Sequence, residues 1–211
     1  TISTMRIERV EPSKHKKGRI LAFLEDGTCL KITEQELLDF GLRPGDTLDE
    51  ETLARLRASA DGSNAKAAAA ALVGRRAMSR ADLTQKLREK GVSAAEADYA
   101  AQWLEAIGAL NDADYAAALV RHCAQMGYGP ARWRDELRRH GVDRELWDEA
   151  MDAAPPMEET IDRYLASRLR SRVLDERERK RTADALARRG FSWGEVKSAL
   201  GRWTEMEAID E

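Results

Sequence analysis

A short pattern that occurs three times constrains the fold of this chain more than any other feature. Its copies read QKLREKGVSAAE, DELRRHGVDREL and DALARRGFSWGE, and their glycines are Gly91, Gly141 and Gly190. Each copy has a leucine four residues before the glycine, charged residues or histidine just before it, and Ser or Asp two residues after it. Basic side chains favour the last turn of a helix, glycine supplies the left-handed cap, and Ser or Asp begins a new helix. The pattern therefore predicts three corners, at each of which one helix ends and another begins.

Two of the copies strengthen this prediction with a capping box. Ser93 precedes Glu96 by three residues, and Ser192 precedes Glu195 in the same way. In such a pair the hydroxyl and the carboxylate each satisfy a backbone N–H of the first helical turn. The second copy has Asp143 as its expected N-cap without the acidic partner.

Apolar residues at helical spacing predict further helices around the corners. The expected buried stripe before the second corner is Tyr115, Leu119, Cys123 and Met126. The stripe before the third corner is Ile161, Leu165, Leu169 and Val173, and the stripe after the first is Ala97, Ala100, Leu104 and Ile107. The chain is thus expected to be mainly α, an elongated array of three tandem three-helix repeats at residues 61–112, 113–155 and 156–211. The alternative is a compact nine-helix globule with accidental similarity.

Residues 1–60 differ in character and predict a small three-stranded antiparallel β meander with short helices. The segments MRIERV, GRILAFL and TCLKI are rich in β-formers, and an Asp-Gly pair between the last two is a strong hairpin signal. Short helices are expected over Glu34–Phe40 and from Asp49 onward. The stretch ASADGSNA, Ala58–Ala65, is the expected boundary with the repeats. Two roles stay open for this N-terminal extension: an edge strand for a partner, or plain stabilisation.

Composition bounds the class of protein. The 211 residues are 43% apolar and 35% charged, which is typical of a water-soluble helical chain. The formal net charge of -3 argues against a dedicated nucleic-acid-coating protein, because such domains are usually basic. Cys29 and Cys123 lie far apart and form no disulfide or zinc pattern. With no signal pattern and no apolar run of membrane-spanning length, we expect a cytoplasmic protein with no membrane partner.

The side chains that usually carry chemistry do not form a catalytic arrangement. His15, His122 and His140 are scattered, and Cys123 lies on an apolar helical stripe, where a buried thiol is expected. The segment MGYGPAR has two glycines but lacks the Lys-Ser/Thr of a phosphate loop. No nucleophile, base and oxyanion site come together. We therefore expect no enzyme activity, no metal site and no cofactor.

Basic side chains gather around the expected middle helix of each repeat. Arginine outnumbers lysine in these clusters, which favours paired hydrogen bonds to carboxylates or phosphates. For any single arginine, an ordinary solvated helix face is the better interpretation, and it is the recurrence in each repeat that favours a shared basic surface. The expected partner-binding residues are Arg75, Arg76, Lys86, Arg88, Arg132, Arg134, Arg138, Arg139, Arg168, Arg170, Arg172, Arg188 and Arg189.

Several segments together resemble the RecX family of bacterial recombination regulators. They are RRAMSRADLTQKLREKGV, LEAIGALNDADYAAALVRH, GPARWRDELRRHGV and the closing ADALARRGFSWGEVKSAL, and the N-terminal strand-rich segment is similar to an extension in some members. The family signature falls here on Gly108, Leu110, Asp112, Tyr115 and Ala116. The departures are Asp82, where glutamate is usual, and Ala109, where a larger residue is common.

This resemblance implies a non-enzymatic protein that binds the RecA recombinase filament on DNA and acts in DNA recombination, DNA repair and the SOS response. It implies inhibition of ATP hydrolysis, strand exchange and co-protease activity. From the placement of the basic clusters, our hypothesis is that the second and third repeats make the main basic contact with the filament. We expect a monomer with weak DNA binding at most. Two alternatives stay open: a direct DNA-binding protein of helix-turn-helix type, and a passive helical scaffold for an unrelated partner.

Overall fold

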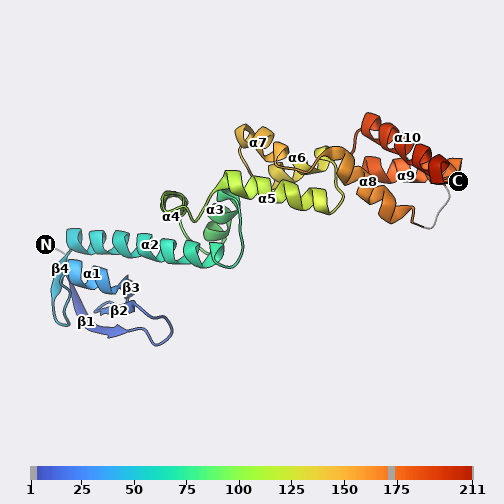
Figure 1. Cartoon of the computed structure of the whole chain (residues 1–211). Helices are drawn as coiled ribbons and strands as arrows, with labels where there is room; N and C mark the ends of the chain where they lie inside the picture. Colours follow the sequence, from blue (N-terminus) through green and yellow to red (C-terminus); the bar gives the residue numbers. More distant parts are fainter. Residues whose placement is uncertain (1–3, 171–173, 211) are drawn as a thin grey trace. The chain divides into compact units, whose positions relative to one another are not determined.

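The computed structural model describes residues 4–170 and 174–210, which are mainly helical with one sheet near the N-terminus (Figure 1). The chain divides into two compact units. The N-terminal unit comprises Thr1–Arg76 and Leu83–Leu110, and the C-terminal unit comprises Ala77–Asp82 and Asn111–Glu211. The outline of the whole array stays a prediction.

The sheet is antiparallel and has four strands within the described residues, in the order β3-β2-β1-β4. The strands are β1 (Thr4–Pro12), β2 (Arg19–Leu24), β3 (Cys29–Thr33) and β4 (Thr47–Asp49). The expected Asp-Gly hairpin joins β2 to β3, and Gly27 there has a φ of +82°. The prediction of three strands was wrong by one, because β4 has only three residues and shows no alternation that a pattern could detect. It pairs with the start of β1, where Met5 faces Leu48.

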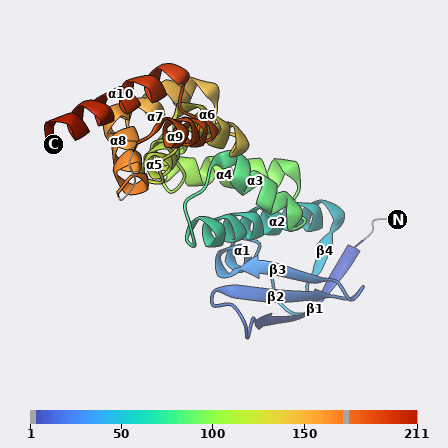
Figure 2. The ribbon, with the colours of Figure 1, turned by 90° about the vertical axis from the view of Figure 1, so that its right-hand side faces the viewer.

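One face of the sheet is covered by helices and forms the core of the N-terminal unit (Figure 2). Helix α1 (Glu34–Asp39) starts with a capping box between Thr33 and Glu36, and α2 (Glu50–Val73) starts at the N-cap Asp49. The alternating residues of the strands point into this core, and Leu53 and Leu56 of α2 meet them. The short helix predicted over Glu34–Phe40 is confirmed, and α2 begins where a helix was predicted, but it is long, with 24 residues.

The stretch Ala58–Ala65, expected to be a boundary, is instead the middle of α2. Its small polar residues form buried contacts rather than a loop. Ser59 and Ser63 both donate hydrogen bonds to the carboxylate of Glu36, which is only 6% exposed. Gly62 faces the ring of Tyr99. Tertiary contacts thus override the low helix propensity of the stretch, and the domain limits derived from it stay a prediction.

The helices of the three repeats follow the predicted order. The first repeat uses the end of α2, then α3 (Arg80–Glu89) and α4 (Ala94–Ala106). The second has α5 (Asp112–Gln125), α6 (Pro130–Arg139) and α7 (Trp147–Asp152), and the third has α8 (Met157–Arg168), α9 (Glu176–Arg188) and α10 (Trp193–Asp210). All three corner glycines have positive φ, at +87°, +65° and +96° along the chain. The predicted left-handed corners are confirmed.

Several local predictions need correction. Both capping boxes form, but Asp143 makes no side-chain cap, because a tight 3₁₀ turn over Arg144–Leu146 precedes α7. Ile107 and Met126 are exposed rather than buried, since each lies at the C-cap of its helix, where the chain leaves the core. The burial in α5 falls on Ala116, Val120, Cys123 and Ala124. Val173, predicted to be buried, lies outside the described residues.

The second and third corners rest on the preceding repeat in the same way. The amide N–H of Gly129, at the start of α6, donates a 2.8 Å hydrogen bond to the carbonyl of Arg189. The equivalent residue at the start of α3, Ser79, donates from its hydroxyl to the carbonyl of His140. In both cases the accepting carbonyl belongs to the residue just before the corner glycine. The second and third corners are therefore both turns within their own repeats and joints to the start of the preceding repeat's middle helix.

Candidate partner-binding surface

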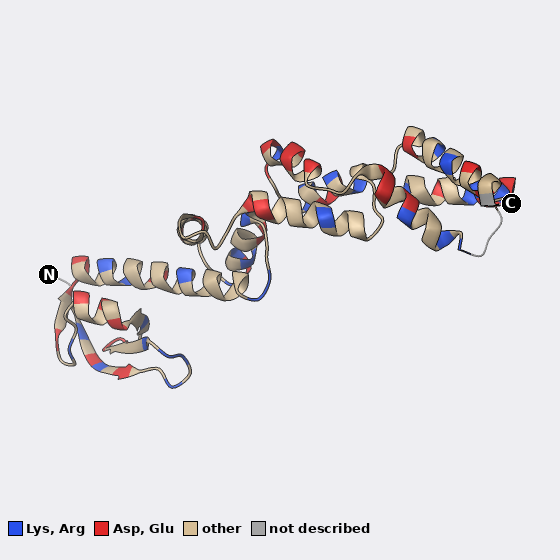
Figure 3. Ribbon diagram, viewed as in Figure 1, with Lys and Arg blue, Asp and Glu red and all other residues tan. Residues whose placement is uncertain are grey.

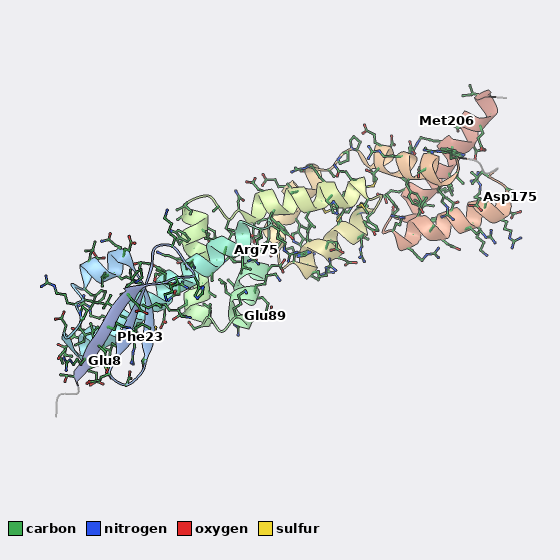
Figure 4. The ribbon with its side chains drawn as sticks, turned by 90° about the horizontal axis from the view of Figure 1, so that it is seen from below. Glu8, Phe23, Arg75, Glu89, Asp175 and Met206 are labelled. Atoms are coloured by element: carbon green, nitrogen blue, oxygen red, sulfur yellow. The ribbon has the colours of Figure 1, made fainter. Side chains whose placement is uncertain are left out.

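The predicted basic residues lie on or beside the middle helices of the repeats (Figure 3). Arg75 and Arg76 lie between α2 and α3, with Arg75 labelled in Figure 4, and Lys86 and Arg88 lie on α3. The four arginines predicted in the second repeat are on α6, and Arg188 and Arg189 are at the end of α9. Arg168 and Arg170 are at the end of α8, and Arg172 lies outside the described residues. The structure divides this set into two groups, those with internal partners and those without.

Glu136 engages two of the arginines on α6. Its side chain is on the buried side of the helix and is 11% exposed. Arg132 lies 3.1 Å from one carboxylate oxygen, and Arg139 pairs with the other. Because a buried carboxylate needs compensating charge, these two guanidinium groups stabilise the fold as well as facing solvent.

Arg138 has a weaker internal contact. It lies 2.8 Å from Asp135, and both side chains are more than 60% exposed. Its guanidinium group also lies 5.7 Å from the ring centre of Trp147. Exposed pairs of this kind contribute roughly 0–1 kcal/mol, so Arg138 can exchange Asp135 for an acidic group of a partner at little cost.

Arg168 joins two helices of the third repeat. Its Nε donates a 3.2 Å hydrogen bond to the hydroxyl of Thr182 on α9, and its amino group lies 3.7 Å from Glu178. Thr182 is fully buried, and the carboxylate of Glu178 is nearly so. The side chain therefore holds α8 against α9.

Arg189 is a structural link between the second and third repeats. It donates hydrogen bonds to the carbonyls of Met126, at 2.9 Å, and Gly127, at 3.4 Å. Its guanidinium group lies over the rings of Tyr128 and Tyr164, 5.1 and 4.5 Å from their centres. Contact of Arg189 with a partner stays a prediction, but its place in the joint is established by this geometry.

The remaining predicted residues have no carboxylate partner in the part of the chain that the structure describes. All are exposed except Lys86, which is half-buried. They are Arg75, Arg76, Lys86, Arg88, Arg134, Arg170 and Arg188. These side chains therefore give up no internal ion pair when they bind an anionic group of a partner.

Helix α9 adds basic residues that the predicted set lacks. Arg177 and Arg181 are exposed and precede Arg188 by eleven and seven residues, so all three share one face of the helix. Lys180 lies beside this stripe. The run RERKR signals these charges in the sequence, but their common face follows only once the register and start of α9 are known.

Other chemistry has little support in the described residues. No group of three or more His, Cys, Asp or Glu side chains there is placed to hold a metal ion. Cys123 is buried, and burial, followed by the charge of Glu136, raises the pKa of its thiol. Among the described helices none has both the length and the apolar character needed to cross a bilayer. The arrangement is suited to binding carboxylates or phosphates through guanidinium groups.

Comparison with known proteins identifies the repeats. Two family models match, described as RecX, first three-helix domain, over residues 65–104 and RecX, second three-helix domain, over residues 111–151. A regulatory protein RecX from Ectopseudomonas mendocina (strain ymp) is 38% identical over 130 residues, which cover 59% of this chain and 85% of that protein. This chain belongs to the RecX family.

Other RecX proteins agree with this assignment. One from Stenotrophomonas maltophilia (strain R551-3) is 38% identical over 130 residues, covering 61% of this chain and 80% of that protein. A crystal structure of regulatory protein RecX matches with a TM-score of 0.70 and 23% identity, over 93% of this chain and 99% of that one. At that identity the RecX structure supports the fold, including the N-terminal part that precedes both matched domains.

Proposed function

We propose that this RecX family member binds the RecA recombinase filament on DNA and inhibits its ATPase, strand exchange and co-protease activities. The observation that carries the proposal is the group of exposed basic side chains without internal partners on and beside α3, α6 and α9. The relatives named regulatory protein RecX support a regulatory rather than a catalytic role. A filament of protein subunits bound along DNA offers both protein carboxylates and DNA phosphates to these arginines.

The three repeats also favour a partner that is itself repetitive. Each repeat offers a few exposed cations, and a single exposed ion pair contributes little binding energy. When several repeats bind at once, the later contacts are intramolecular, so weak contacts combine into useful avidity. A filament with regularly spaced subunits is a partner of this kind.

Reversing one free arginine in each of two repeats tests the proposal. We expect R134E/R188E to raise the concentration needed for half-inhibition of the DNA-dependent RecA ATPase by at least about tenfold, because two attractive contacts become repulsive. The measurement is the ATPase rate of preformed filaments with substoichiometric protein added. Helical circular dichroism should match the unsubstituted protein, because neither side chain has an internal partner in the described structure.

The matched control is R43E/R57E, which makes the same change of charge at exposed positions of the N-terminal unit. The control should inhibit as the unsubstituted protein does. Equal inhibition by R134E/R188E and the unsubstituted protein would refute the assigned surface. Failure of the unsubstituted protein to inhibit RecA at all would refute the function itself.

Direct binding to duplex DNA is the second candidate, and the stripe of Arg177, Arg181 and Arg188 on α9 favours it. A helix that exposes several cations on one face can follow a phosphate backbone. Tight and steeply salt-dependent binding to naked duplex DNA, without recombinase, would support this candidate over the first.

A further inference from the structure

The first corner differs from the other two in what lies against it. At the second and third corners a β-carbon added to the glycine would lie within 2.6 Å of the preceding repeat, so those joints are filled. At Gly91 an added β-carbon would meet no atom within 4 Å. Here the preceding element is the N-terminal sheet, and a pocket of about 420 Å³ lies beside the corner.

Basic side chains from four segments line this pocket. Lys16 comes from the loop between β1 and β2, Arg19 from β2, Lys31 from β3 and Lys90 from the residue before the corner glycine. No carboxylate lies within salt-bridge distance of any of them in the described parts of the chain. Burial, and then the nearby charge of Arg19, lower the pKa of Lys16, as expected where cations gather without enough compensating charge.

Asn64 of α2 holds the basic wall in place. Its side-chain oxygen accepts a 2.5 Å hydrogen bond from the guanidinium group of Arg19. Its amide group donates a 2.8 Å hydrogen bond to the backbone carbonyl of Lys31. This gives a reason for an asparagine in the middle of a long helix, where it has poor propensity. The two strands and the helix thus present their cations to one space.

The pocket also has an acidic side, formed by Asp61 of α2 and Glu96 of α4. Burial, and then the charge of Glu96, raise the pKa of Asp61, so these two carboxylates repel each other. The charge of Arg57 acts on the pKa of Asp61 in the opposite sense, but Arg57 does not line the pocket. An anion would therefore lie at the sheet side, against Lys16 and Lys31.

We propose that this pocket binds the backbone phosphates of a polynucleotide. No aromatic side chain lines it, so it offers no surface on which a nucleobase could stack. Three of its four cations are lysines, which bind phosphate as mobile point charges. The single arginine, whose fork would favour a carboxylate, is already hydrogen-bonded to Asn64. The proposal concerns a surface in the N-terminal unit and requires no recombinase, so it goes beyond the proposed function.

The test is fluorescence anisotropy of a labelled single-stranded oligonucleotide with the full chain, over a series of salt concentrations and without recombinase. The variant is K16Q/K31Q, which removes two of the lining charges. We expect its affinity at low salt to fall about tenfold, and the slope of log K against log salt to become shallower by about 1.4, because about 0.7 is lost for each phosphate contact to a single strand. The control K14Q/K17Q changes the same charge at neighbouring exposed positions that do not line the pocket, and should keep the original slope.

Several results would overturn the proposal. They are an unchanged slope in K16Q/K31Q, an equal loss in K14Q/K17Q, or no oligonucleotide binding by the unsubstituted protein at low salt. Competition distinguishes the possible sources of the anion. Displacement of the oligonucleotide by ATP at similar concentrations would assign the pocket to a free nucleotide, and stronger displacement by polyglutamate would assign it to an acidic protein segment. Either outcome would overturn the assignment of a polynucleotide as the ligand.

Circular dichroism of both variants checks that they fold, and the RecA ATPase assay above remains a separate test of the proposed function.

Discussion

Arg188 and Arg189 are neighbours in the sequence and look equivalent there, yet the structure gives them different environments. Arg188 is exposed and has no internal partner in the described residues. Arg189 is hydrogen-bonded to two carbonyls and stacked between two tyrosine rings. Because a substitution at each residue would remove the same charge, the pair separates binding from stability.

We expect R189A to lower the free energy of unfolding by about 1–3 kcal/mol, because it removes charge-assisted hydrogen bonds and cation–π contacts in the joint. R188A should change it by less than about 0.5 kcal/mol, as is usual for an exposed side chain. Urea denaturation followed by circular dichroism measures both values. Equal stability of the two variants would contradict the structural role of Arg189. A charge reversal at Arg189 would combine a loss of stability with any loss of partner binding. The variant R134E/R188E leaves Arg189 unchanged and avoids this.

At the scale of elements, the three corners share a pattern in sequence but not a surrounding. The backbone at each corner glycine has a positive φ, so an alanine at any of these positions would be strained even where no neighbouring atom is close. At Gly190 an added β-carbon would also lie 2.6 Å from the backbone nitrogen of Arg132. At Gly91 the strain acts alone, because nothing lies within 4 Å.

Substituting these two glycines should therefore have unequal effects. We expect G91A to cost about 1–2 kcal/mol of stability, the usual cost of a left-handed conformation for a residue with a β-carbon. G190A should cost at least about 2 kcal/mol more, because backbone atoms of the second and third repeats must also move apart. Chemical denaturation of both proteins under identical conditions provides the comparison. Similar losses in the two variants would show that the joint at Gly190 is not closely packed.

The elements also show why part of the fold could be predicted and part could not. The corners are local: capping residues, a glycine and a leucine lie within one dozen positions, and short-range physics specifies them. The middle of α2 is not local. Ser59 and Asn64 favour loops on their own, and their helical state depends on Glu36 and Arg19, which are distant in sequence. The strand β4 escaped prediction for the same reason, since three residues form a strand only beside β1.

At the scale of the whole molecule, charge is distributed so that a net charge of -3 coexists with exposed basic stripes. The order of residues in the sequence shows which positions are basic and along which segments they gather. It could not predict which arginines are used internally, because the partners of Arg132, Arg168 and Arg189 come from helix faces and joints that exist only after folding. The group of basic residues without internal partners is therefore smaller than the predicted set, and Arg177 and Arg181 of α9 extend it.

If several repeats contact one filament, their contributions should add. The loss of inhibition by each variant, expressed as the ratio of half-inhibitory concentrations, converts to a free-energy change. We expect the changes for R134E and R188E to sum to that of the double variant within about 0.5 kcal/mol, as independent contacts do. The RecA ATPase assay with all three proteins measures this. A double variant no weaker than the worse single variant would indicate that only one of the two repeats reaches the filament.

The joint between repeats has a consequence for how surveys of this family should be interpreted. At the second and third corners, the residue before the glycine accepts through its backbone carbonyl the hydrogen bond that joins one repeat to the next, in His140 as in Arg189. The side chains at these two positions also hold the joints, because the imidazole of His140 contacts the carboxylate of Asp82 and the guanidinium group of Arg189 donates to the carbonyl of Met126. Lost activity after substitution there would therefore report damaged architecture rather than lost recognition. A mutational scan that leaves those two positions unchanged, and substitutes only the exposed residues beside them, would map the surface that contacts the partner.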